Sequence, residues 1–357
     1  MTGSSGRRRE GGESEQQRPN MSRHLFYSVV LLLVVMMHCA CGAAAAGEGN
    51  VDKRVDALMG IKWEKIDSWE DVSDAGGKYS SLRGPSLVEV QGHVFAIAEA
   101  HCKDGVDCSD ASFTGIASKH LSLSGDGVAT EISVANAVVR GTDLLKEGSE
   151  GISNRNGMLR PTTLVIGDSV YMLLGNCSRT KQQIEGNNER GLLLVKGTVT
   201  DVGEKRKIIW NETHVVKPQG KGYSHSLTEL LGGGGSGAVM RDGALVFPMQ
   251  AKYKDGTSVL LSMRLPNSGN KWELSSKKPG KGCMDPSVAK WKDEYGEYLF
   301  MMAHCAGGYY DIYGSTADGV NWYPLGQPIT RVWGNSRDRV GYGVRSGFAT
   351  AIIEKRR

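Results

Sequence analysis

A repeated β-hairpin pattern constrains the fold of this chain more than any other feature of its sequence. In residues 81–102, an extended run reaches a Gln91-Gly92 turn and continues from His93 as a second extended run. Two such runs joined by a two-residue turn are typical of a β-hairpin. Similar segments recur at residues 159–175, 236–250 and 283–303. A single hairpin cannot bury its own apolar face, so the repetition predicts a radial or stacked β-architecture.

Three of the four copies also place a charged residue next to a proline ahead of the first strand. These charged residues are Arg83, Arg160 and Asp285. No segment after residue 46 shows sustained helical periodicity, and extended runs recur at fairly regular spacing. Both features predict an all-β fold. A β-propeller accounts best for the repeated hairpins, and a β-sandwich is the alternative.

Polar turns that precede a tryptophan support the same architecture. An Asp-Gly-Val sequence occurs in residues 119–131 and again in residues 315–322, and residues 266–272 keep the spacing from glycine to tryptophan. Turn side chains can hydrogen-bond the bent backbone while a buried indole fixes the turn to the sheet. We therefore interpret these turns as structural caps of hairpins.

The composition favours a turn-rich globular β-protein and gives no support to nucleic-acid binding. The chain has 357 residues, 48 glycines and 39% hydrophobic residues. Its net charge of +4 comes from 43 basic and 39 acidic residues, without a basic stripe interleaved with aromatic residues. The glycine-rich segment 232–237 lacks the Lys and Ser/Thr of a phosphate-binding loop. We interpret that segment as a flexible lead into the third hairpin.

Residues 1–46 form a leader ahead of the folded chain. Residues 1–20 are polar and low in complexity, and an apolar run at 25–37 is followed by small residues. This order is typical of a secretory signal peptide. A transmembrane anchor is the alternative, but the run is shorter than the ~20 residues that cross a bilayer. The sequence predicts one folded unit at 47–357, no transmembrane span in the mature chain, and a location at the cell surface or outside the cell.

Export would place the cysteines in an oxidising compartment, where disulfides form. Cys102 and Cys108 enclose a short loop after a strand, so we predict that they are bonded to each other. Cys283 and Cys305 flank the fourth hairpin and could form a second disulfide. The cysteine spacing matches no zinc signature, and we expect neither a metal site nor a cofactor.

Two acceptor sequons for N-linked glycosylation would be exposed to modification on an exported chain. They are Asn176-Cys177-Ser178 and Asn211-Glu212-Thr213. We predict glycans on both asparagines. An unused chance match is the alternative at each.

Several of these segments together resemble a known family. Arg83 to Leu87 is similar to the Arg-Ile-Pro motif of sialidases, and the polar turns are similar to their Asp boxes. The hairpins LVEVQGHVFAIAEA and LVIGDSVYMLLG, with Arg331 to Gly334 and the MSRHLF leader, resemble the trypanosome trans-sialidase superfamily of surface glycoproteins. The resemblance runs from Met21 to the end and implies a sialidase-type six-bladed β-propeller.

The resemblance also assigns roles to individual residues. In active members, arginines hold the sialic-acid carboxylate, because guanidinium groups match a carboxylate and stay charged. Arg83 matches the first of these arginines, the second falls near His304, and a substrate-binding Asp falls at Arg160. The acid/base Asp falls at Glu99, and the Glu that assists the Tyr nucleophile falls at Asp285.

These matches depart from the pattern of the active members. Arg160 reverses the charge of the substrate-binding Asp, and His101 stands where the family has a further arginine. A histidine at position 304 would be mostly neutral near pH 7 and could not replace a fixed guanidinium. Loss of these groups removes the positioning of a substrate carboxylate. We therefore expect no confident catalytic residue, only degenerate positions.

The resemblance further implies a propeller that is incomplete at its C-terminus. The third arginine and the Tyr nucleophile belong to parts of the family pattern beyond Arg357, as do a lectin-like domain and a lipid-anchor signal. A fifth hairpin begins at Phe348, close to the end of the chain. We expect no lectin-like domain in this chain.

Two functions of different classes follow from these observations. The first is a surface or secreted glycoprotein that binds host cell-surface glycoconjugates or matrix proteins, in adhesion and virulence, with sialidase chemistry lost. The second is an exo-α-sialidase or trans-sialidase, supported by the fold and Arg83. Arg83 also has a structural alternative, an ion pair with Glu99 or Asp285. A gene fragment without function is a further alternative.

Overall fold

The computed structural model describes most of the chain between residues 56 and 326. The described residues are 56–66, 69–72, 79, 81–102, 113–121, 143–147, 159–177, 191–203, 205–219, 227–269, 271–275, 282–293, 295–306, 309–316 and 318–326. The predicted leader, residues 1–46, and the fifth hairpin lie outside them.

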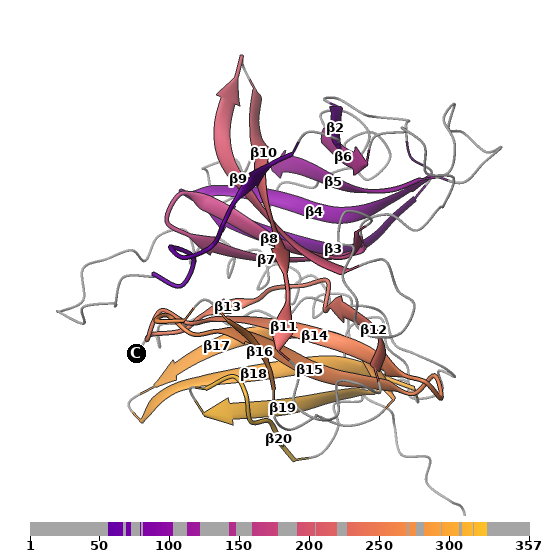
Figure 1. The fold of residues 1–357 in the computed structure, drawn as a ribbon, viewed down its shortest axis with the longest axis vertical. Coiled ribbons are helices and arrows are strands. Elements are labelled where there is room, and N and C mark those ends of the chain that lie inside the picture. The colour runs from indigo at the N-terminus through magenta and orange to yellow at the C-terminus, as the bar shows by residue number, and fades with distance from the viewer. Residues whose placement is uncertain are drawn as a thin grey trace, which may run out of the picture. The chain divides into compact units, whose positions relative to one another are not determined.

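The described residues form four sheets of mostly antiparallel strands (Figure 1), which we name the first to fourth blades in chain order. The first blade has the order β2-β6-β5-β4-β3 and the second has the order β1-β10-β9-β8-β7. The strands of the first blade are β2 (Trp69–Val72), β3 (Ser81–Val90), β4 (His93–Cys102), β5 (Phe113–Leu121) and β6 (Asp143–Glu147). Those of the second are β1 (Glu64–Lys65), β7 (Leu159–Ile166), β8 (Ser169–Cys177), β9 (Gly191–Val202) and β10 (Lys205–Val216).

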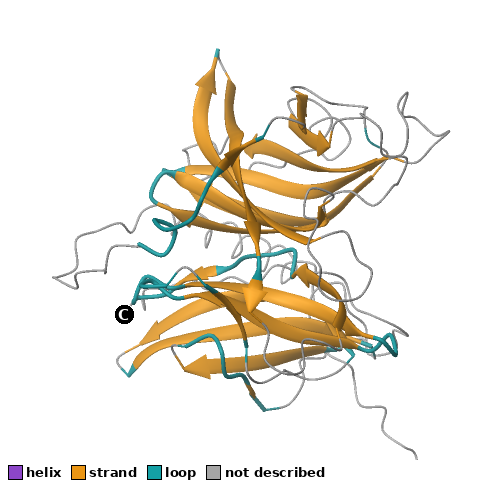
Figure 2. Ribbon diagram, viewed as in Figure 1, coloured by secondary structure: helices purple, strands orange, loops and turns teal. Residues whose placement is uncertain are grey.

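The third blade has the order β11-β16-β15-β14-β12, with β13 also paired to β14, and the fourth has the order β17-β18-β19-β20. The strands of the third blade are β11 (Pro218–Gln219), β12 (Leu227–Gly232), β13 (Ala238–Val239), β14 (Leu245–Tyr253), β15 (Ser258–Leu265) and β16 (Trp272–Leu274). Those of the fourth are β17 (Cys283–Asp293), β18 (Gly296–Cys305), β19 (Tyr310–Thr316) and β20 (Tyr323–Pro324). Figure 2 shows strands and loops, without a helix, throughout the described residues.

This arrangement confirms the all-β prediction and the repeated hairpins. Each predicted hairpin copy is an antiparallel pair in its own blade: β3–β4, β7–β8, β13–β14 and β17–β18. The four sheets have a propeller-like arrangement, so the β-sandwich alternative is wrong. A total of six blades and an incomplete C-terminus stay predictions, because residues 327–357 lie outside the described part of the chain.

Apolar clusters between consecutive blades form the core. One cluster joins the first and second blades, another joins the second and third, and another joins the third and fourth. Alternate residues of one strand therefore serve two clusters: Met172 of β8 belongs to the first of these and Leu173 to the second. Side chains alternate across a strand, so a blade between two neighbours needs apolar residues on both faces. This explains why LLLV at 192–195 is continuously apolar.

A β-bulge at the residue before proline is common to three blades. Gly84, Arg160 and Asp285 precede the prolines and have φ of 55°, 57° and 51°, and the strand register shifts beside each of them. An extra residue in one strand bends it and turns its side chain out of the regular alternation. The sequence comparison that grouped Arg83 with Arg160 and Asp285 was therefore wrong by one position. The equivalent of Arg160 in the first blade is Gly84.

The glycine-rich segment 232–237 packs against β7 and β17. The N–H of Thr163 on β7 donates to the carbonyl of Gly235 over 3.0 Å, and the N–H of Val288 on β17 donates to the carbonyl of Ser236 over 3.2 Å. A Cβ added to several of these glycines would fall within 3.0 Å of neighbouring atoms. The prediction of a flexible lead was wrong, because the glycines allow the backbone to approach two other blades closely.

The predicted structural role of the polar turns is supported at Asp318. Its carboxylate accepts hydrogen bonds from Ser315 Oγ, the Val320 N–H and Asn321 Nδ2, each over 2.8 Å, and Trp322 beside it is buried. Burial raises the pKa of Asp318, but the hydrogen bonds outweigh it and hold the pKa below its usual value. The corresponding residues 122–130 of the first turn lie outside the described residues.

Candidate functional site

Five residues to which the family resemblance drew attention form a connected group, which we name the central cluster: Glu99, His101, Arg160, Asp285 and His304. Glu99 Oε1 accepts a hydrogen bond from the backbone N–H of Arg160 over 2.7 Å. The guanidinium of Arg160 forms an ion pair with Asp285. His304 Nε2 lies 2.6 Å from Asp285 Oδ2, and His101 Nε2 lies 3.1 Å from Glu99 Oε2. Residues of the first, second and fourth blades thus share one polar network.

The β-bulges explain why Arg160 and Asp285 reach each other. In a bulge, the extra residue is left out of the ladder, so its N–H needs another acceptor. The N–H of Arg160 bonds to Glu99 on β4, and the N–H of Asp285 bonds to Gln250 Oε1 on β14 over 2.9 Å. Each acceptor belongs to the second strand of the hairpin in the preceding blade, β4 or β14. The same arrangement therefore recurs at two blade junctions.

Sequence reasoning missed Gln250. A signal was present, because Glu99 follows the turn glycine Gly92 at the same distance that separates Gln250 from the turn glycine Gly243. A neutral amide fills the role at one junction and a carboxylate fills it at the other. Glu99 therefore has a structural task, the support of the Arg160 bulge, that does not require sialidase chemistry.

The central cluster is mostly withdrawn from water. Glu99, Asp285 and His304 are 4%, 7% and 5% exposed, and the Arg160 side chain is 16% exposed. Buried ionised groups are costly unless they are paired and hydrogen-bonded. The ion pair and the imidazole contacts supply these partners within the protein. The cationic group of Arg160 is thereby neutralised by a carboxylate of the same chain.

Arg83 lies apart from this network. It is exposed, and its Cα pairs with that of Glu99 in the β3–β4 ladder. Glu99 directs its carboxylate to Arg160 and His101, and Asp285 directs its own to Arg160 and His304. Among the described residues, the contacts given for these two carboxylates run to Arg160, His101 and His304, and an Arg83 ion pair with Glu99 or Asp285 stays a prediction.

The other predicted sites are only partly covered by the described residues. Cys283 and Cys305 form the second disulfide that the sequence suggested. Cys102 is disulfide-bonded, but its partner is not among the described side chains, and Cys108 lies outside them. The pairing of Cys102 with Cys108 therefore stays a prediction. The side chain of Asn176 also lies outside the described part, whereas Asn211 is exposed on β10.

One group of potential metal ligands occurs among the described residues. The ligand atoms of Cys283, Cys305 and Asp311 lie within 4.8 Å of one another. The two cysteines are bonded to each other, so their sulfurs are not thiolate ligands in this state. Metal binding here would require reduction of the disulfide.

Comparison with known proteins places the chain in a family. The family model described as BNR repeat-like domain matches residues 84–357. The chain belongs to this family of BNR repeat-like domains, as a member of the sialidase-like superfamily. This BNR repeat-like protein is 27% identical over 304 residues to "Sialidase 85-1.1" of Trypanosoma cruzi. A second relative, "Sialidase" of Trypanosoma cruzi, is 24% identical over 269 residues.

Solved structures show the same fold. The Trypanosoma rangeli sialidase in complex with the inhibitor DANA superposes with a TM-score of 0.51 at 23% identity, covering 69% of the BNR repeat-like protein and 38% of that chain. A mutant of Trypanosoma rangeli sialidase displaying trans-sialidase activity superposes with a TM-score of 0.52 at 23% identity, covering 73% and 42%. At this level of identity the likeness establishes the fold alone.

The BNR repeat-like protein spans only part of its relatives. The match to "Sialidase 85-1.1" covers 79% of this chain but 38% of that protein, and the match to the second relative covers 72% and 21%. Among the residues described here, no helix is long and apolar enough to cross a membrane.

Proposed function

We propose that this BNR repeat-like protein is an exported surface or secreted glycoprotein that binds host cell-surface glycoconjugates or matrix proteins, with sialidase chemistry lost. The observation that carries the proposal is the ion pair between Arg160 and Asp285, with His304 on the same carboxylate. A site for an anionic sugar needs a guanidinium that is available to the sugar carboxylate. In this protein the buried carboxylate of Asp285 is already the partner of the Arg160 guanidinium, so this guanidinium is not available to a sugar carboxylate.

The charge distribution supports the loss of catalysis. The resemblance places the acid/base at Glu99, but this carboxylate accepts the N–H of the Arg160 bulge and contacts His101. Asp285 is likewise held between Arg160 and His304. Differential stabilisation of a transition state requires groups that engage the substrate, and these groups engage each other. The exposed Arg83 supplies a single guanidinium that could contact a sugar carboxylate.

The alternative function is an exo-α-sialidase or trans-sialidase. Its support is the presence of Glu99 and Asp285 in one cluster and the likeness to proteins named sialidase. In that case Glu99 would serve as general acid and base, and Asp285 would assist the nucleophile. This function requires the Arg160–Asp285 pair to open for the substrate.

A turnover assay separates the two functions. Full-length protein, secreted from a eukaryotic host, is incubated with a fluorogenic α-sialoside beside a boiled sample. We expect no release of fluorophore above the boiled control. Turnover that disappears in Glu99→Gln, a variant that keeps an acceptor for the Arg160 N–H, would overturn the loss of catalysis.

Binding of a sialoside is measured separately by calorimetry. One exposed guanidinium should give a Kd near 1 mM, which corresponds to about −4 kcal/mol. Micromolar binding that is abolished in Arg83→Ala but retained in Arg241→Ala, an exposed arginine on another blade, would contradict this expectation. It would show that the protein still has a sialoside site that includes Arg83.

Adhesion is tested with the same secreted protein. Saturable binding to immobilised cell-surface glycoconjugates or matrix proteins is expected, with a similar level on sialidase-treated and untreated cells. Absence of saturable binding to all of these surfaces would refute the adhesive function. Complete loss of binding after removal of sialic acid would instead favour a sialic acid site.

A further inference from the structure

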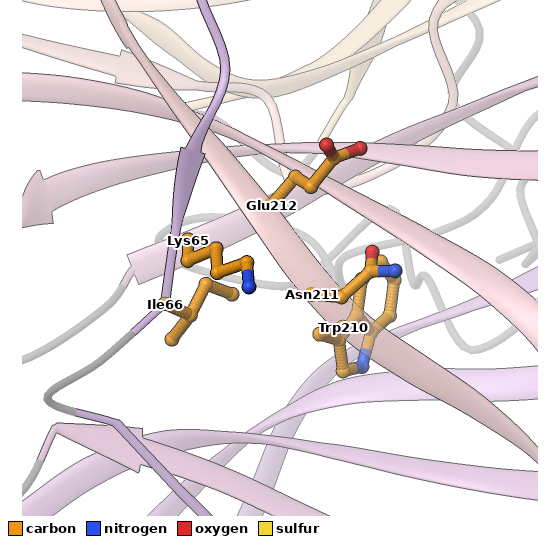
Figure 3. Close-up of a pocket in the computed structure, with 5 residues that line it drawn as sticks. All are labelled: Lys65, Ile66, Trp210, Asn211 and Glu212. Carbon is orange, nitrogen blue, oxygen red and sulfur yellow. The ribbon is translucent and has the colours of Figure 1, made fainter.

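The acceptor residue of one sequon lines an open pocket of about 460 Å³. The pocket is lined by Lys65, Ile66, Trp210, Asn211 and Glu212. Figure 3 shows Lys65 and Ile66 on one side and Trp210 and Asn211 on the other. Pockets for small molecules range from roughly 300 to 1,000 Å³. The space therefore suits one sugar residue with its substituents.

A β-bulge places the sequon asparagine at this pocket. The register between β9 and β10 shifts between Trp210 and Glu212, so Asn211 is the extra residue of the bulge. A bulged residue is unpaired in the ladder, and the Asn211 side chain is exposed. The asparagine amide is thus presented outside the sheet, although its neighbours belong to a regular strand pair.

The pocket lies where a short edge strand leaves its partner. Strand β1 pairs with β10 only at Glu64 opposite Thr213 and Lys65 opposite Glu212. Beyond them the N–H of Ile66 reaches the carbonyl of Asn211 over 3.4 Å, a long hydrogen bond. Within the described residues, the contacts of β1 with β10 therefore end beside the pocket.

We infer that Asn211 carries an N-linked glycan and that its first N-acetylglucosamine occupies this pocket. The sugar has an apolar ring face that suits Ile66 and the mostly buried Trp210, and hydroxyl and acetamide groups that suit Lys65 and Glu212, whose carboxylate also accepts from Lys196 over 3.0 Å. Covalent attachment places the sugar beside the pocket at high effective concentration, so weak contacts suffice to hold it. The glycan would then cover the end of the β1–β10 pair.

The modification uses a lipid-linked oligosaccharide diphosphate as donor. Asn211 Nδ2 forms the bond to the anomeric carbon, the bond from that carbon to the diphosphate oxygen breaks, and the amide proton passes to the released diphosphate. Thr213 is 4% exposed and its hydroxyl donates to the carbonyl of Glu64 over 3.3 Å. Transfer therefore precedes the docking of β1 on β10.

The experiment uses the full chain in a eukaryotic secretory host, because the inference rests on the proposed export. Export is read from the protein in the medium, and occupancy of Asn211 from peptide mapping. Thr213→Ser, which keeps the sequon and the hydroxyl, should stay modified, and Asn211→Gln should lose one glycan mass. An exported chain with unmodified Asn211 refutes this inference alone. A chain that stays inside the cell with both sequons unmodified refutes the export and this inference together.

The position of the sugar is tested by enzymatic trimming of the folded glycoprotein. Endoglycosidase H leaves one N-acetylglucosamine on the asparagine, whereas peptide N-glycosidase F removes the whole glycan and converts Asn211 to Asp. We expect the trimmed form to melt with the intact glycoprotein, and the fully deglycosylated form to melt about 2 °C or more lower, as Asn211→Asp does. Equal melting of all forms would refute the pocket assignment.

Discussion

Replacement of Gly233 by alanine tests the packing of the glycine-rich segment against the fourth blade. Gly233 is buried, and its N–H donates to the carbonyl of Pro248 over 2.9 Å. A Cβ at this position would lie 3.0 Å from the carbonyl carbon of Pro286, 3.2 Å from its Cγ, and closer still to its carbonyl oxygen. These are largely backbone atoms and cannot rotate away. The alanine therefore forces β17 or the glycine segment to move.

We expect Gly233→Ala to lower the free energy of unfolding by an amount at the upper end of the range for overpacked cores. Extra methyl groups in a packed core cost about 1–3 kcal/mol, and we expect about 3 kcal/mol because the obstruction is backbone. For a domain of this size that corresponds to a fall in Tm on the order of 5–10 °C. Pro286 follows Asp285, so the movement should also disturb the ion pair with Arg160.

The assay is urea denaturation followed by tryptophan fluorescence, with Gly269→Ala as the matched control. The Cβ of an alanine at 269 would be 3.6 Å or more from its neighbours, an ordinary contact. That variant should be neutral or slightly more stable, by about 0.4–1 kcal/mol, because alanine restricts the unfolded chain. If Gly233→Ala is as stable as Gly269→Ala, the segment does not pack against Pro286 and the reasoning is refuted.

Three further predictions concern the turns, the histidines and the disulfide. Asp318→Ala should cost about 2–4 kcal/mol in urea denaturation, because its hydrogen-bond donors lose a charged acceptor. Asp255→Ala, which removes the acceptor of the Thr257 N–H on an exposed turn, should cost about 1 kcal/mol; equal losses would contradict the structural role of the Asp318 turn. Burial, followed by the nearby histidine and arginine charges, lowers the pKa of His120 below 6.5, so the unfolded chain binds the proton more readily. Stability should therefore fall as the pH drops below about 6.5, and less steeply in His120→Gln; the same pH dependence in both proteins would exclude this group as the cause. The double change Cys283→Ala/Cys305→Ala should lower the free energy of unfolding by about 3 kcal/mol, because the disulfide joins residues 22 positions apart in the chain. If the unchanged protein unfolds at the same urea concentration under reducing and oxidising conditions, the disulfide does not make this contribution.

The hairpins could be predicted because they depend on local order. The Gln91-Gly92 turn has φ of 52° and 78°, a conformation that a two-residue hairpin turn requires and that glycine adopts readily. Strands β8 and β9 have apolar residues on both faces, as strands enclosed by neighbours require. Each hairpin can therefore be predicted from the sequence of its own segment.

Which residue of each strand forms the bulge could not be predicted from the positions of the charged residues. Arg83, Arg160 and Asp285 look equivalent because each stands near a proline, but one extra residue in each strand sets which side chain turns toward the other blades. A one-residue shift reverses the direction of a side chain in a strand. Arg83 is exposed for this reason, while the other two meet in the central cluster.

By itself, the sequence determines the blades, the residue types at the blade ends and the family to which the chain belongs. Only the tertiary structure decides which of those residues meet. Glu99 and Arg160 are 61 positions apart in the chain, and the contact of the Arg160 backbone with that carboxylate exists only because successive blades pack against one another. The ion pair of Arg160 with Asp285 depends in the same way on the second and fourth blades. No local pattern encodes such a partner, since the energy of a buried charge is set by the groups that surround it after folding.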